Sequence, residues 1–86
     1  MRIAPPPCYE RLNERTKLQI RIDAQYFTEA CKYSGDDAIL KARTEICIYL
    51  NAMADCGVIT DKEHSELYNA MTADGNEEYE KRIHQS

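Results

Sequence analysis

Apolar residues recur at helical spacing in the first half of the chain. Residues 9–34 contain no Gly or Pro, and their apolar positions form two neighbouring helical lines. The first line contains Ile20, Ala24, Phe27 and Cys31, and the second contains Ile22, Tyr26, Ala30 and Tyr33. Together they predict one long helix with a wide apolar face. Residues 18–23 alternate with period two and also fit a short strand, but an isolated strand would have no partner, so a helix is favoured.

The spacing of residues 37–56 predicts a second helix. Gly35 is expected to end the first helix as its C′ residue, and Asp36 or Asp37 to cap the second. The inward line of this helix contains Ile39, Arg43, Ile46, Leu50 and Met53. This line is the strongest core candidate in the sequence.

A third helix is predicted over residues 61–73 by two local signals. Gly57 followed by Val58 is typical of a Schellman motif that closes the preceding helix. Thr60 and Glu63 then have the spacing of a capping box, in which each side chain bonds the backbone of the other residue. The sequence Asp-Gly-Asn at residues 74–76 is expected to end this helix.

The ends of the chain are predicted to lie outside the helical domain of residues 9–76. Three consecutive Pro residues indicate an extended Pro-rich arm over residues 1–8. Residues 77–86 are expected to form charged C-terminal turns or a tail. The predicted fold class is therefore all-α, a small helical domain of three to four helices built on an antiparallel helical hairpin.

Length and composition add expectations about compartment and assembly. The chain has 86 residues, enough for one domain with a modest core. It has no apolar run of the roughly 18 residues that a membrane span needs and no signal-peptide pattern, so a cytoplasmic protein is expected. The four Cys residues form no close pair and are expected to stay reduced. Because two apolar lines exceed what one neighbouring helix covers, a homodimer is expected.

Residues for catalysis or cofactor binding are not evident. The Cys and His spacings do not match those of structural zinc sites, and phosphate-binding Gly-rich loops are absent. His64 lies on an exposed first turn of a predicted helix, and His84 lies close to the end of the chain, so neither is placed as a general base. The sequence predicts a protein that is not an enzyme and binds no metal or cofactor.

Charge is distributed unevenly along the chain. Residues 1–43 hold eight Lys or Arg against six Asp or Glu, a balance of +2, whereas residues 44–86 hold three against nine, a balance of −6. The acids assigned to a partner-binding surface are Asp61, Glu63, Glu66, Asp74, Glu77, Glu78 and Glu80. Such a surface could bind a basic groove on a protein that handles nucleic acid, while a purely solubilising acidic face is the simpler alternative.

A second hypothesis assigns function to the basic N-terminal section. In it, a small homodimeric regulator contacts nucleic acid through Arg11, Arg15, Lys17 and Arg21. Direct DNA binding by a helix-turn-helix over residues 37–73 is disfavoured, because residues 61–73 hold one Lys against three acids.

In length, charge and lack of catalytic residues, the chain resembles the small accessory proteins of phages and mobile elements. That group includes inhibitors of host defence nucleases. The resemblance implies a binding protein that inhibits or modulates a host complex.

Overall fold

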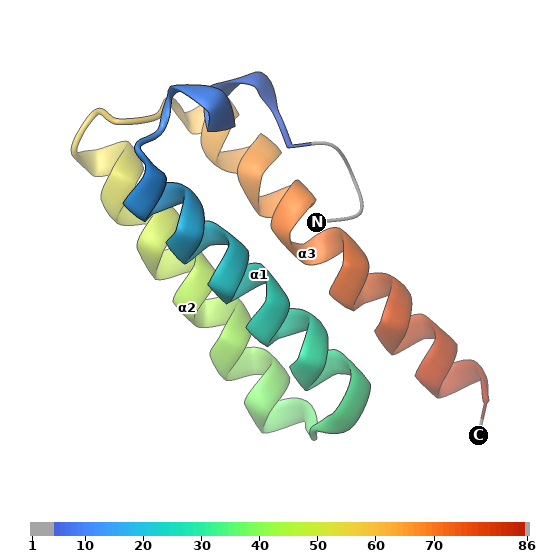
Figure 1. Cartoon of the computed structure of the whole chain (residues 1–86). Helices are drawn as coiled ribbons and strands as arrows, with labels where there is room; N and C mark the ends of the chain where they lie inside the picture. The colour runs from blue at the N-terminus through green and yellow to red at the C-terminus, as the bar shows by residue number, and fades with distance from the viewer. Residues whose placement is uncertain (1–4, 86) are drawn as a thin grey trace.

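Three α-helices, packed side by side, make up most of the structure. A computed structural model describes residues 5–85, in which α1 (Glu14–Tyr33), α2 (Asp36–Asp55) and α3 (Asp61–His84) follow a short 3-10 helix, η1 (Pro7–Arg11). α1 and α2 form an antiparallel hairpin, and α3 runs parallel to α1 (Figure 1). The all-α prediction is confirmed, with three α-helices in the described residues rather than three to four.

The N-terminal segment differs from both the arm and the helix that the sequence predicts there. Pro6 is extended, but Pro7 begins η1, and residues 1–4 of the predicted arm lie outside the described residues. The first long helix begins at Glu14 instead of residue 9, because the Asn13 side chain caps it by accepting a 2.8 Å hydrogen bond from the Thr16 N–H. η1 crosses the end of the bundle beside the start of α3 (Figure 1).

The connection between α1 and α2 consists only of the two capping residues between Tyr33 and Asp36. Ser34 is the C-cap of α1, and Gly35 is already the N-cap of α2. Gly35 follows the C-cap of α1 and therefore occupies the C′ position as expected, although its φ of −84° is not the left-handed conformation typical of a C′ glycine. Asp36 and Asp37 do not cap α2 but lie in its first turn, where their negative charge favours the positive end of the helix dipole.

Both local signals between α2 and α3 are confirmed. Gly57 has a φ of +76°, its N–H bonds to the Ala54 carbonyl at 3.1 Å, and the Val58 N–H bonds to the Met53 carbonyl at 2.9 Å. These two bonds define a Schellman motif. Thr60 and Glu63 form the capping box, with both reciprocal hydrogen bonds present.

The predicted end of α3 at residues 74–76 is wrong, because the helix continues to His84. Gly75 is buried within α3 against the ring of Phe27, and its missing side chain allows this close approach. Tyr79 packs against the core one turn later. Residues 77–84 therefore belong to the helix, since tertiary contacts outweigh the low helix propensity of Asp-Gly-Asn.

A side chain from the last turns of α3 caps α1. The Arg82 guanidinium donates through one nitrogen to the Cys31 carbonyl at 3.1 Å and to the Ser34 carbonyl. These carbonyls belong to the C-terminal end of α1, where a positive charge also favours the helix dipole. This contact attaches the C-terminal part of α3 to the rest of the bundle.

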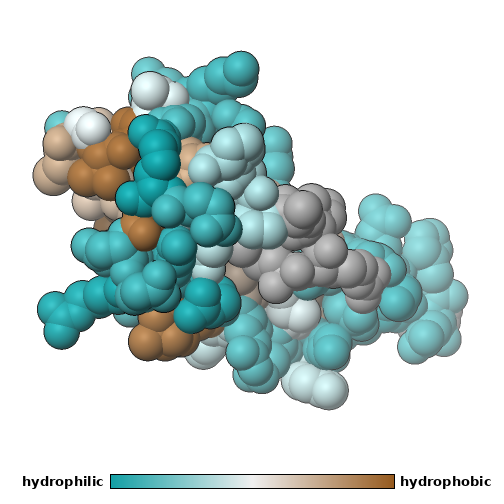
Figure 2. Space-filling view, turned by 45° about the horizontal axis from the view of Figure 1, so that its top comes forward, coloured by the Kyte–Doolittle hydropathy of each residue, from teal (hydrophilic) through white to brown (hydrophobic). Residues whose placement is uncertain are grey.

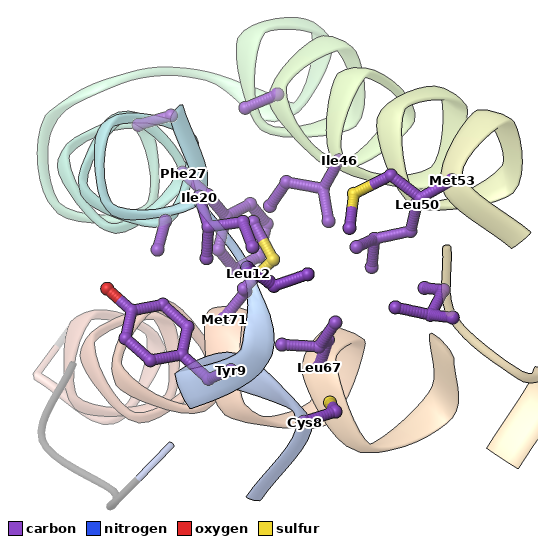
Figure 3. Packing of buried hydrophobic residues seen from close by; sticks show 14 of the residues in the cluster. Cys8, Tyr9, Leu12, Ile20, Phe27, Ile46, Leu50, Met53, Leu67 and Met71 are labelled. Carbon is purple, nitrogen blue, oxygen red and sulfur yellow. The ribbon is translucent and has the colours of Figure 1, made fainter. Parts of the chain in front are cut away.

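The core lies between the three helices and is closed at one end by η1 (Figure 3). The largest fully buried side chains are Phe27, Ile20, Ile46, Leu50, Leu67, Met71 and Cys31. Cys8 and Tyr9 of η1 and the adjacent Leu12 are also buried and extend the core beyond the helices. Of the two predicted apolar lines on α1, the Ile20 line is buried, whereas Ile22, Tyr26 and Tyr33 of the other remain exposed.

Candidate protein-binding surface

The seven acids assigned to a partner-binding surface all lie on α3 but not on one side of it. At 100° per residue, Glu63, Glu66, Asp74 and Glu77 follow one line along the helix. Glu78 and Glu80 flank this line, and Asp61 lies on the opposite side of the helix. Four of the seven predicted acids therefore share one line, and Glu78 and Glu80 lie on opposite flanks of it.

Glu63, at the start of this line, has a structural role. Its carboxylate accepts a 2.9 Å hydrogen bond from the Thr60 N–H. It also accepts a hydrogen bond from the Arg11 guanidinium of η1, with which it forms an ion pair. The hydrogen bond from the Thr60 backbone is the main cause that lowers the pKa of Glu63 below its ordinary value, and Arg11 lowers it further. Glu63 is therefore committed to capping α3 and holding η1.

The lowered pKa of Glu63 predicts a pH dependence of stability. A carboxyl whose pKa is lower in the folded state contributes stability above its unfolded pKa and loses that contribution as the pH falls through its folded pKa. The variant Glu63→Gln keeps a side chain that can complete the capping box but does not titrate. We expect urea unfolding to show a smaller loss of stability on acidification for Glu63→Gln than for the wild type. Identical pH profiles would contradict this role of Glu63.

The other acids of the line lie further along α3. Glu66 is half-buried near Cys8, whose pKa is raised mainly by burial and further by the charges of Glu63 and Glu66. Asp74 lines a shallow hollow between α1 and α3 together with Arg21. Glu77 and Glu80 are exposed, and Glu78 is half-buried.

Local cations partly offset the charge at the C-terminal end of α3. The Lys81 ammonium lies 3.5 Å from a carboxylate oxygen of Glu77 and 3.7 Å from one of Glu78. Exposed pairs at this spacing add only a few tenths of a kcal/mol to helix stability. Glu77 and Glu78 therefore have a local ion-pair partner, while this side of α3 keeps a net negative charge. We call Glu66, Asp74, Glu77, Glu78 and Glu80 the acidic surface of α3.

The four cations of the predicted nucleic-acid contact are mostly engaged within the chain. Arg11 contacts Glu63, and the Arg21 guanidinium donates a 2.6 Å hydrogen bond to the Tyr9 hydroxyl. The Lys17 ammonium lies 3.5 Å from carboxylates of both Glu10 and Glu14 and 5.5 Å from the centre of the Tyr9 ring. Arg15 is exposed on α1. The structure thus spreads these side chains over η1 and α1 and uses three of them to hold η1 in place.

Large apolar side chains also reach the surface. Figure 2 shows a face on which hydrophilic residues predominate and hydrophobic residues gather in separate patches. The exposed large apolar residues are Leu18, Ile22, Tyr26, Tyr33, Leu40, Ile48, Val58 and Ile83. Four of these belong to α1 and recur at helical spacing on its outward side.

Burial keeps the two thiols of the core in their less reactive protonated form. Burial raises the pKa of Cys8 and of Cys31, so both remain protonated at neutral pH. Within residues 5–85, no three His, Cys, Asp or Glu side chains are grouped so that they could hold a metal ion. None of the helices in the same part of the chain combines the length and apolar content of a membrane span.

Comparison of the chain with protein-family models, with curated proteins and with solved structures found no match. The surface must therefore be interpreted from its own geometry. The contact between Arg11 and Glu63 could not be predicted from the sequence, because these residues are 52 positions apart and no local pattern connects them.

Proposed function

We propose that the protein is a non-enzymatic binding protein whose acidic surface of α3 docks against a basic surface of another protein. The observation that carries this proposal is the charge balance of −6 in residues 44–86, together with the line of acids along one continuous helix. A continuous helix holds the carboxylates at fixed spacing, which favours recognition of a matching row of Lys or Arg side chains.

The chemistry of the acidic surface favours a partner that itself handles nucleic acid. A groove that binds phosphates is lined with Lys and Arg, and a row of carboxylates can compete for the same cations. The proposed role of this protein is to inhibit or modulate such a partner, for example a host defence complex. This is the role of an accessory protein of a phage or mobile element.

Direct contact with nucleic acid is the less favoured function. Counterion release from phosphates needs several cations on one face that can turn toward the duplex. Arg11, Lys17 and Arg21 instead contact Glu63, Glu10, Glu14 or Tyr9 within the chain. A nucleic-acid contact would have to break these interactions.

The proposal predicts that neutralising the C-terminal part of the acidic surface weakens partner binding. Each protein is immobilised on a support and incubated with a host-cell lysate. We expect the triple variant Glu77→Gln, Glu78→Gln and Glu80→Gln to recover at least about tenfold less of the partner than the wild type. Circular dichroism should show that the variant keeps its helical content, because Glu77 and Glu80 are exposed and the half-buried Glu78 is replaced by a side chain of similar size.

A matched triple variant on α2 shows whether partner binding depends on where the negative charges lie or only on the net charge of the protein. Asp37→Asn, Glu45→Gln and Asp55→Asn remove the same number of charges from exposed positions outside the acidic surface. This control should recover as much partner as the wild type. Equal recovery by all three proteins would refute the proposal. Retention of duplex DNA by the wild type, lost on neutralising Arg15 and Lys17, would replace it with the nucleic-acid function.

A further inference from the structure

The outward side of α1 carries an apolar stripe that no part of the described chain covers. Leu18 and Ile22 are each 50% exposed, and Tyr26 is 46% exposed, although the three lie in the middle of the helix. Arg15 and Glu29 lie on the same line, one turn before Leu18 and one turn after Tyr26, and both are exposed. This stripe is separate from the acidic surface of α3.

We propose that the stripe is a homodimer interface in which α1 packs antiparallel against α1 of a second copy, with Ile22 on the two-fold axis. The homodimer does not depend on the function proposed above, since it uses other residues on another helix. An isologous interface requires a surface that is complementary to itself under a two-fold rotation. The stripe on α1 meets this requirement.

The complementarity follows from the positions of residues around Ile22. In an antiparallel pair centred there, each residue faces the one equally far from Ile22 on the other copy. Leu18 and Tyr26, four residues to either side, therefore form apolar pairs across the axis. Arg15 and Glu29, seven residues to either side, form two pairs of opposite charge that bound the apolar centre.

Opposite charges at the two ends also determine the direction of pairing. In a parallel pair, Arg15 would face Arg15 and Glu29 would face Glu29 of the second copy, and these like charges would repel. Glu29 accepts a 3.2 Å hydrogen bond from Gln25 through one oxygen, so its other oxygen can accept from Arg15 of the second copy. Antiparallel pairing therefore combines the apolar contact with attraction at both ends.

The size of the stripe predicts a weak, concentration-dependent dimer. Stable interfaces bury about 800 Å² on each partner. The paired stretch of residues 15–29 is roughly 20 Å of helix at a rise of about 1.5 Å per residue, so the interface belongs to the small class below about 1,200 Å² in total. We expect a dissociation constant of roughly 10–100 µM, as is typical of small transient interfaces.

Sedimentation equilibrium between roughly 5 µM and 1 mM tests the assembly over the range that contains this dissociation constant. The wild type should change from monomer to dimer. Ile22→Glu would place two carboxylates together at the axis and should keep the protein monomeric throughout. Ile48→Glu is the matched control, because Ile48 is 62% exposed but lies on α2, and this variant should dimerise like the wild type. Circular dichroism checks that both variants remain folded.

A charge swap tests the orientation. Arg15→Glu alone and Glu29→Arg alone should each weaken the dimer roughly tenfold, because each creates two pairs of like charge. The double variant restores opposite charges across the axis and should return to within about threefold of the wild type. A monomeric wild type at 1 mM, a dimer that survives Ile22→Glu, or a double variant as weak as the singles would overturn the proposal.

Discussion

Replacing Leu50 with alanine is expected to lower the free energy of unfolding by about 2–5 kcal/mol. Leu50 lies on the inward line of α2, is fully buried, and faces the core that α1 and α3 complete (Figure 3). Removing its branched end would take apolar surface out of contact and leave a cavity, since the surrounding helices can collapse only in part. Domains are commonly stable by only about 5–15 kcal/mol, so this loss should be large in urea unfolding.

Ile48 provides the control for Leu50 on the same helix. It lies two positions earlier and is 62% exposed. Ile48→Ala should change the free energy of unfolding by no more than about 0.5 kcal/mol, as is usual for surface positions. Similar, small effects of both substitutions would show that α2 does not present Leu50 to the core.

Replacing Gly75 with alanine is expected to destabilise the protein by about 1–3 kcal/mol, the usual range for overpacking a core. Alanine at an exposed position inside a helix would instead stabilise it by about 1 kcal/mol relative to glycine. A Cβ at position 75 would lie 2.5 Å from two ring carbons of Phe27 and 3.2 Å from the Cys31 sulfur. Phe27 is fully buried, so its ring cannot swing away without disturbing the core.

Two further variants show whether the contact with Phe27 causes this loss. Asn76→Ala changes the next, exposed residue of α3 and should stabilise the helix by about 0.5 kcal/mol. Phe27→Leu removes part of the ring, so the cost of Gly75→Ala should be smaller in that background than in the wild type. A stabilising effect of Gly75→Ala in thermal unfolding would contradict the packing described for α3.

The elements that could be predicted from sequence are those set by neighbouring residues. The Schellman motif at Gly57 and the capping box of Thr60 and Glu63 form as predicted, because each uses hydrogen bonds between residues only a few positions apart. The inward line of α2 was also evident, since a strong helical period identifies the residues of a core face.

The elements that the sequence analysis missed depend on contacts between distant residues. Asp-Gly-Asn at residues 74–76 has the composition of a helix end, yet Gly75 packs on Phe27 and Arg82 caps α1. Likewise, residues 7–11 fold as η1, since Cys8 and Tyr9 are buried in the core. No local pattern encodes such contacts, so helix propensity alone gives the wrong start for α1 and the wrong end for α3.

The candidate surface was predictable as a charge pattern but not as a geometry. The charge balance identified the acidic half of the chain, and helical spacing now places four of the seven acids on one line of α3. The role of Glu63 in capping and in binding Arg11 became clear only from the structure. The surplus of apolar residues on α1 suggested a homodimer, whereas the antiparallel register proposed for it rests on which line remains exposed.

The salt dependence of association tests the proposed function most directly. With the captured partner in solution, the association rate of the wild type should fall steeply as ionic strength rises, because opposite charges steer the encounter. The triple variant Glu77→Gln, Glu78→Gln and Glu80→Gln should associate more slowly at low salt, with a flatter salt dependence, and approach the wild type at high salt. Identical salt dependence of the two proteins would contradict the assignment of the partner interface to the acidic surface of α3.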